Sequence, residues 1–226
     1  MTADFFTKKR WFYVVSYALL LVFMGVCMCY TTMLKRALPV WVGKSFYFLV
    51  SENTHIDVGA YETRLDGGAG YLLHFEGKDY VVLSVYFNET DGMAVQVGIS
   101  EPTKLLQWNI PYLYLKTRTE KKKKEVIQGA LNSFYGCIDI LSQGIAKLEQ
   151  GLTQQSCRRI LTLLNKKYTY MQEVYKERYP PFSKVCANIQ TEIEKLLSTT
   201  IYCKDLRYIL CKACDAYIGL ATFFSL

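Results

Sequence analysis

Residues 79–87, DYVVLSVYF, decide the fold of the middle of this chain. β-branched and aromatic residues dominate the run, and both kinds fit the pleated, half-buried surface of a sheet. A turn, Glu76-Gly77-Lys78, directly precedes it. The run is therefore the strongest strand prediction in the protein, and the neighbouring elements are predicted from the periodicity on either side of it.

Three other segments have the periodicity of strands, and two segments between them suit helices. The strands are predicted over residues 45–51, 71–75 and 108–116, and the helices over residues 55–65 and from Asn88 or Thr90 to about Ile99. Pro111 makes the last strand an edge strand, because proline lacks the N–H group that a central strand needs. The predicted order is βαββαβ, a four-stranded antiparallel sheet with two helices on one face.

Two-residue periodicity divides the side chains of each strand between the two sheet faces. One row is aliphatic and suits the helices, and the other contains Tyr, Ser and Lys. We expect the second row to form an open polar-aromatic face for sugar rings or stacked bases, unless its tyrosines only cover the sheet or pack beneath C-terminal helices. The candidate ligand-binding residues are Tyr47, Ser51, Tyr80, Ser84, Tyr86, Tyr112, Tyr114 and Lys116.

This middle segment resembles a divergent SPOR (sporulation-related) domain over about residues 45–116. The segments that carry the resemblance are FYFLV (46–50), GGAGYLL (67–73), GKDYVVLSVYFN (77–88) and DGMAVQ (91–96). The resemblance implies a bacterial domain that sits outside a single membrane helix and binds septal peptidoglycan, on glycan stripped of its stem peptides. The first strand departs from the family pattern, with Phe-Leu-Val-Ser in place of a Gln-Val-Gly-like segment.

The N-terminal part predicts an uncleaved transmembrane helix. Residues 11–34 contain no charged side chain, and at ~1.5 Å per residue they span about 36 Å, enough for a bilayer core. Basic residues close both ends, with residues 8–10 on one side and Lys35 and Arg36 on the other. The short basic tail and the resemblance together predict a single-pass protein of the bacterial cell membrane, with a cytoplasmic N-terminus, an extracytoplasmic bulk and the bilayer as a partner.

The C-terminal part changes to helical periodicity and to a different charge balance. Residues 37–118 carry 6 Lys/Arg against 9 Asp/Glu, whereas residues 119–226 carry 16 against 10. Apolar residues recur every three or four positions and predict four helices, either an up-down bundle or a pair of hairpins. The fold class is thus α+β, with predicted domains at residues 1–36, 37–118 and 119–226. The basic block at residues 121–124 is a linker, a solvated helix face, or a contact for anionic lipid or wall polymer.

Six of the eight cysteines lie in the helical part, at Cys137, Cys157, Cys186, Cys203, Cys211 and Cys214. The last two have the two-residue gap of zinc and redox motifs, but no second pair accompanies them. Both histidines, His55 and His74, are distant in sequence. We therefore expect small buried side chains, or disulfides if this part is extracytoplasmic, and neither a metal nor a cofactor.

No catalytic constellation emerges from the sequence, and this favours a binding protein. Residues 67–70, GGAG, lack the lysine and the spacing of a phosphate-binding loop. The expected function is a non-enzymatic envelope protein that binds peptidoglycan glycan in cell division or sporulation. One alternative is a membrane scaffold whose helical part binds a protein partner. An RNA-recognition module is a weaker alternative, because the acidic balance of residues 37–118 argues against a nucleic-acid partner.

Overall fold

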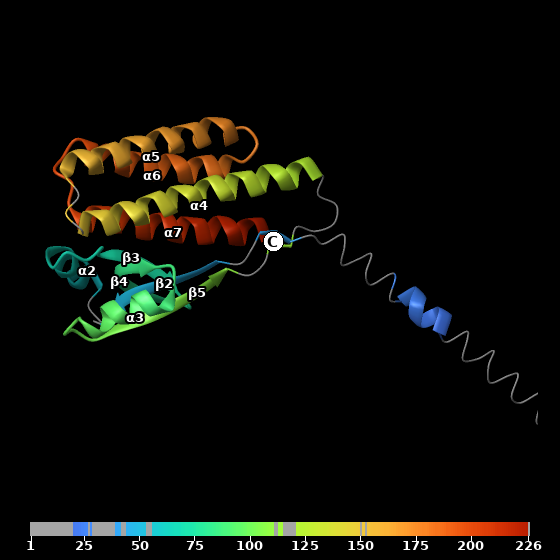
Figure 1. The fold of residues 1–226 in the computed structure, drawn as a ribbon, viewed down its shortest axis with the longest axis horizontal. Helices are drawn as coiled ribbons and strands as arrows, with labels where there is room; N and C mark the ends of the chain where they lie inside the picture. The colour runs from blue at the N-terminus through green and yellow to red at the C-terminus, as the bar shows by residue number, and fades with distance from the viewer. Residues whose placement is uncertain are drawn as a thin grey trace, which may run out of the picture.

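A four-stranded antiparallel sheet and a layer of four long helices make up most of the described molecule (Figure 1). The computed structural model describes residues 20–26, 28, 39–41, 44–52, 56–110, 113–114, 121–149, 151 and 153–225. The sheet has the order β3-β4-β2-β5, and its strands are β2 (Lys44–Ser51), β3 (Tyr71–Phe75), β4 (Lys78–Tyr86) and β5 (Thr103–Ile110). With α2 (Ile56–Leu65) and α3 (Glu89–Val97), the chain has the predicted βαββαβ order and the predicted α+β character.

The helical layer consists of α4 (Lys121–Glu149), α5 (Gln154–Tyr175), α6 (Pro180–Leu197) and α7 (Cys203–Ser225). Local chemistry explains two of the boundaries. The side chain of Thr153 accepts a hydrogen bond from the backbone N–H of Ser156 and so caps α5. Two prolines open α6, where the missing N–H groups cost nothing. Figure 1 shows that α7 lies nearest to the strands.

A bulge in the pairing of β2 with β4 divides the predicted polar row between the two sheet faces. Leu49 pairs with Ser84, but the next residue, Val50, pairs with Val82, so Leu83 is an extra residue. Before the bulge, Tyr80 shares a face with Phe48. After it, Tyr86 pairs with Tyr47 and points to the opposite face. A single extra residue therefore reverses every side chain that follows it.

Helices cover both faces of the sheet. On the first face, the Phe46 ring packs edge-on against Tyr217 of α7, with the ring centroids 5.8 Å apart. On the second face, Gly92 of α3 lies so close to Leu105 that an added Cβ atom would be 2.8 Å from its Cδ1. Gly59 of α2 lies over Val81, and an added Cβ atom there would be 3.7 Å from its Cγ2 atom, an ordinary contact. The expected face, open across the whole sheet, is therefore not found in the described residues.

The fourth strand of the sheet begins earlier than predicted. It runs over β5, five residues ahead of the predicted start at Trp108, and it ends at Ile110. Leu105 and Leu106 are adjacent, so alternation alone does not mark them as strand. Each faces a different helix-covered side of the sheet, which explains the apolar pair. After β5, the next strand, β6 (Leu113–Tyr114), does not belong to this sheet and pairs with β1 (Pro39–Trp41).

The predicted membrane-spanning helix is contradicted. Among the residues that the structure describes, none of the helices is both long and apolar enough to cross a bilayer. Residues 20–26 and 28 are helical and exposed, and the remainder of the predicted span, residues 11–34, lies outside the described residues. The single-pass topology and the localisation in a bacterial cell membrane depended on that helix, so both predictions are wrong.

Candidate functional site

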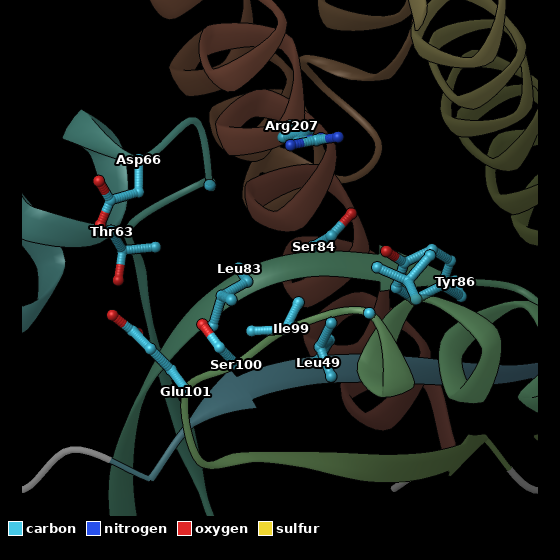
Figure 2. A pocket seen from close by; sticks show the side chains of 13 residues that line it. Leu49, Thr63, Asp66, Leu83, Ser84, Tyr86, Ile99, Ser100, Glu101 and Arg207 are labelled. Atoms are coloured by element: carbon cyan, nitrogen blue, oxygen red, sulfur yellow. The ribbon is translucent and has the colours of Figure 1, made fainter.

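A cavity of about 440 Å³ lies where the sheet, two short helices and the helical layer meet. Figure 2 shows its lining, with Thr63 and Asp66 on one side, Arg207 above and Tyr86 at the other end. Its walls come from the end of α2, the connection between α3 and β5, the C-terminal half of β4 and the first turns of α7. The lining residues are Leu49, Thr63, Asp66, Gly68, Leu83, Ser84, Tyr86, Val95, Gly98, Ile99, Ser100, Glu101 and Arg207.

Glycines let the chain turn tightly beside this cavity. Gly67 and Gly70 have φ angles of +91° and +58°, a region that favours glycine. A Cβ atom on Gly68 would lie 2.5 Å from the Cγ2 atom of Thr63. The backbone N–H of Gly68 donates to the carbonyl oxygen of Thr63 (2.8 Å), and that of Ala69 donates to Leu83 (2.8 Å). The turn therefore holds α2 against the bulge of β4 and fixes one wall.

Arg207 joins this turn to the helical layer. Its Nη1 group donates to the carbonyl oxygen of Gly67 (2.8 Å), and its Nη2 group donates to Oε1 of Glu149 in α4 (2.5 Å). Burial acts to lower the pKa of the guanidinium, but the hydrogen bond and the negative charge of Glu149 more than offset it, so the pKa is raised. Arg207 therefore stays charged and fixed at the top of the cavity.

Tyr86 provides a phenol at the opposite end. Burial raises the pKa of this phenol, while a hydrogen bond with Ser84 and the nearby Arg207 charge act in the opposite direction. Because the net shift is upward, the hydroxyl keeps its proton at neutral pH and can act as donor or acceptor. Between these polar groups the cavity has an apolar surface formed by Leu83, Val95 and Ile99, whereas Leu49 is fully buried.

Carboxylates line the side of the cavity that faces α2. Asp66 and Glu101 belong to the lining, and both also line an adjoining hollow of about 300 Å³ together with Glu62. Carboxylate oxygens accept hydrogen bonds and donate none when ionised. Within the described ranges, no group of His, Cys, Asp and Glu side chains could hold a metal ion. The arrangement therefore suits a ligand rich in hydrogen-bond donors.

The structure brings only some of the predicted site residues together. Ser84 and Tyr86 line the main cavity, and Ser51 lines the adjoining hollow. Tyr47 lies outside both and accepts a hydrogen bond from Gln107 (3.2 Å). Tyr80 packs against the core on the opposite face. Tyr114 belongs to β6, whereas Tyr112 and Lys116 lie outside the described residues.

Five polar lining residues were not predicted from the sequence, namely Thr63, Asp66, Ser100, Glu101 and Arg207. The glycine-rich segment that follows Asp66 was a usable signal, because such a turn often brings the backbone close to a neighbouring element. Arg207 carried no signal, since it lies in a cysteine-rich apolar helix. Its position depends on how α7 packs on the sheet.

The six cysteines of the helical layer are free thiols, and five of them are buried. Burial raises the pKa of Cys137 to about 11 and raises that of Cys214 as well, so these thiols stay protonated at neutral pH. Among the alternatives open from the sequence, the structure has buried thiols rather than disulfides. His74 contacts Oδ1 of Asp79 (2.7 Å) on an exposed hairpin, away from the cavity.

No family model matches this chain, and comparisons with the curated proteins and with the solved structures also gave no match. The resemblance of residues 45–116 to a SPOR domain therefore stays a prediction.

Proposed function

We propose that this protein binds a sugar residue of a peptidoglycan glycan strand in the cavity and catalyses no reaction on it. The observation that carries the proposal is the composition of the lining. It combines an apolar surface with a partly buried phenol, several hydroxyls and the carboxylates of Asp66 and Glu101. Ligand cavities generally pair an apolar surface with a few polar groups that fix orientation.

A sugar ring presents hydroxyls at its edges and C–H groups on its faces. The hydroxyls are donors for Asp66 and Glu101, and such charge-assisted hydrogen bonds are stronger than neutral ones. The C–H groups or the methyl of an N-acetyl substituent would pack on the apolar surface of Leu83 and Ile99. Tyr86 adds a phenol at one end, and it was already a candidate for glycan contact from the sequence.

The choice of peptidoglycan rests on the resemblance to SPOR domains, which implies binding to glycan without stem peptides. The proposed position differs from the expected one, because the cavity lies on the side of the sheet that α2 and α3 cover. A role in cell division or sporulation is part of the same proposal, and it depends on the same resemblance.

Sedimentation of the full chain with purified peptidoglycan tests the proposal. We expect the chain to pellet with the polymer, and more strongly after amidases have removed the stem peptides. Asp66→Asn combined with Glu101→Gln should weaken binding at least about tenfold, because each charge-assisted hydrogen bond contributes about 1.5 kcal/mol or more. Glu173→Gln with Glu177→Gln is the matched control, since both residues are exposed on or just after α5 and the net charge changes equally.

Three results would reject parts of the proposal. A wild-type chain that fails to pellet with either form of peptidoglycan rejects the ligand. Equal binding by the wild type and the cavity variant places the site elsewhere on the molecule. Soluble sugar fragments released from the polymer by the wild type, but not by the cavity variant, would show catalysis.

A further inference from the structure

A shallow basic groove runs along the exposed surface of α5, and none of its lining residues lines the cavity. Its volume is about 380 Å³. The lining residues recur at helical spacing, so they lie on one side of the helix. They are Gln155, Arg158, Arg159, Thr162, Leu163 and Lys166. Three of the six are cationic and no carboxylate is among them, which makes the groove a concentrated patch of positive charge.

The surroundings do not neutralise this charge. α5 carries four Arg or Lys residues and one Glu, and that Glu173 lies about two turns beyond Lys166. On α6, the carboxylate of Glu194 accepts hydrogen bonds from the amides of Asn165 (3.4 Å) and Gln190 (2.9 Å), rather than from a cation of the groove. Within the part of the chain that the structure describes, no ion pair is formed by Arg159 or Lys166.

Arg158 has a different role from the other two cations. Its Nη1 group donates to the carbonyl oxygen of Leu197 (2.5 Å), and its Nη2 group donates to that of Thr199 (2.7 Å). These contacts satisfy carbonyl groups at the C-terminal end of α6 and hold the guanidinium in place. Arg158 therefore forms a fixed part of the groove, while Arg159 and Lys166 have their charged groups available for a ligand.

The geometry points to a binding site for a phosphate-linked polymer without bases. Arg159 and Lys166 are seven residues apart, about 10 Å along the helix, so they reach more than one phosphate of a chain. Guanidinium and ammonium groups are the usual donors to phosphate oxygens, and the side-chain amide of Gln155 adds a neutral donor. Among the residues that the structure describes, no aromatic side chain lines the groove, whereas proteins that bind single-stranded nucleic acid stack bases on such rings.

Titration of the full chain with inorganic polyphosphate at several salt concentrations tests this site. We expect binding whose affinity falls as salt rises, because it depends on displaced counterions. Arg159→Gln with Lys166→Gln should weaken binding about tenfold or more at low salt. It should also reduce the slope of log Kd against log salt by about one for each lost cation.

The matched control is Lys176→Gln with Lys184→Gln, which removes the same charge from exposed positions outside the groove. Circular dichroism checks that both double variants keep their helices. Equal weakening in the control overturns the proposal, because it would mean a response to net charge alone. Two further results also overturn it, namely no binding of polyphosphate by the wild type, and tighter binding to an oligonucleotide or to phosphatidylglycerol vesicles than to polyphosphate. The cavity variants should bind polyphosphate normally, so this test is independent of the glycan proposal.

Discussion

The guanidinium of Arg207 donates a hydrogen bond to the carbonyl oxygen of Gly67 over 2.8 Å, although 140 positions separate the two residues in the chain. This contact joins the turn after α2 to the first turns of α7. The candidate cavity lies directly beside it, with walls from both elements. The shape of the site therefore depends on the packing of the helical layer against the sheet.

We expect Arg207→Ala to lower the free energy of unfolding by about 1–3 kcal/mol. The substitution leaves the Gly67 carbonyl and the Glu149 carboxylate without this donor, and lost hydrogen bonds of charged groups have costs of that size. In a chain of this length each kcal/mol lowers the melting temperature by about 2–4 °C. Thermal unfolding measures the change, with the exposed Arg178→Ala as control. An unchanged melting temperature would show that the contact contributes nothing.

A pair of glycine substitutions should change stability in opposite directions. Gly68→Ala places a Cβ atom 2.5 Å from the Cγ2 atom of Thr63 and 3.1 Å from its carbonyl oxygen, so we expect a loss of about 1–3 kcal/mol. Gly136 lies within α4, and an added Cβ atom there meets nothing within 4 Å. Gly136→Ala should therefore stabilise the protein by about 0.5–1 kcal/mol, because alanine is the better helix former. Chemical denaturation measures both. A stable Gly68→Ala variant would mean that the turn relaxes without cost.

The strand at residues 79–87 could be predicted because its signal is local, and β4 matches it to within one residue at each end. The faces of that strand could not be predicted in the same way. Alternation assumes regular pairing, but the extra residue Leu83 moves Tyr86 to the side opposite Tyr80. Whether a bulge forms depends on the partner strand and on the helices above it, which a two-residue period does not include.

The candidate site depended even more on distant parts of the chain. Ser84 and Tyr86 were predicted as ligand contacts, and they do line the cavity. That prediction assumed an open sheet face, whereas helices cover both faces of the sheet in the structure. Arg207 reaches the cavity because α7 docks on the sheet, and the hydrogen bond that the Tyr71 hydroxyl of β3 donates to Asp215 of α7 (2.6 Å) is one of the contacts between them. Contacts across such sequence separations leave no periodic signal.

Stability should decrease as the pH rises above about 9. Burial raises the pKa of the Cys137 thiol from its ordinary value of 9.0 to about 11, and it raises the pKa of Cys214 and Tyr168 too. Because their pKa is raised in the folded state, these groups contribute fully to the free energy of unfolding below pH 9. This contribution is lost between about pH 9 and 11, where the unfolded chain releases protons that the folded chain retains.

For Cys137 alone the loss amounts to at most about 2–3 kcal/mol, since each pKa unit corresponds to about 1.4 kcal/mol. Urea denaturation at pH 8 and at pH 10.5 measures it. Cys137→Ala should reduce the difference between the two pH values. A wild-type chain that is equally stable at both would contradict the assignment of these groups as buried and protonated.

A final prediction separates the cavity from the sheet surface as the glycan site. Tyr47 and Tyr86 are paired across β2 and β4, so they occupy similar positions in the sheet, but only Tyr86 lines the cavity. Both are partly buried, and each phenol makes a local polar contact, with Gln107 and Ser84 respectively. Removing one hydroxyl from each by substitution with phenylalanine is therefore a matched comparison.

We expect Tyr86→Phe to weaken sedimentation with amidase-treated peptidoglycan by about fivefold, since a neutral hydrogen bond contributes about 1 kcal/mol. Tyr47→Phe should bind like the wild type. The reverse order, with Tyr47→Phe the weaker binder, would move the site to the exposed polar residues of β5 around Gln107 and would reject the cavity.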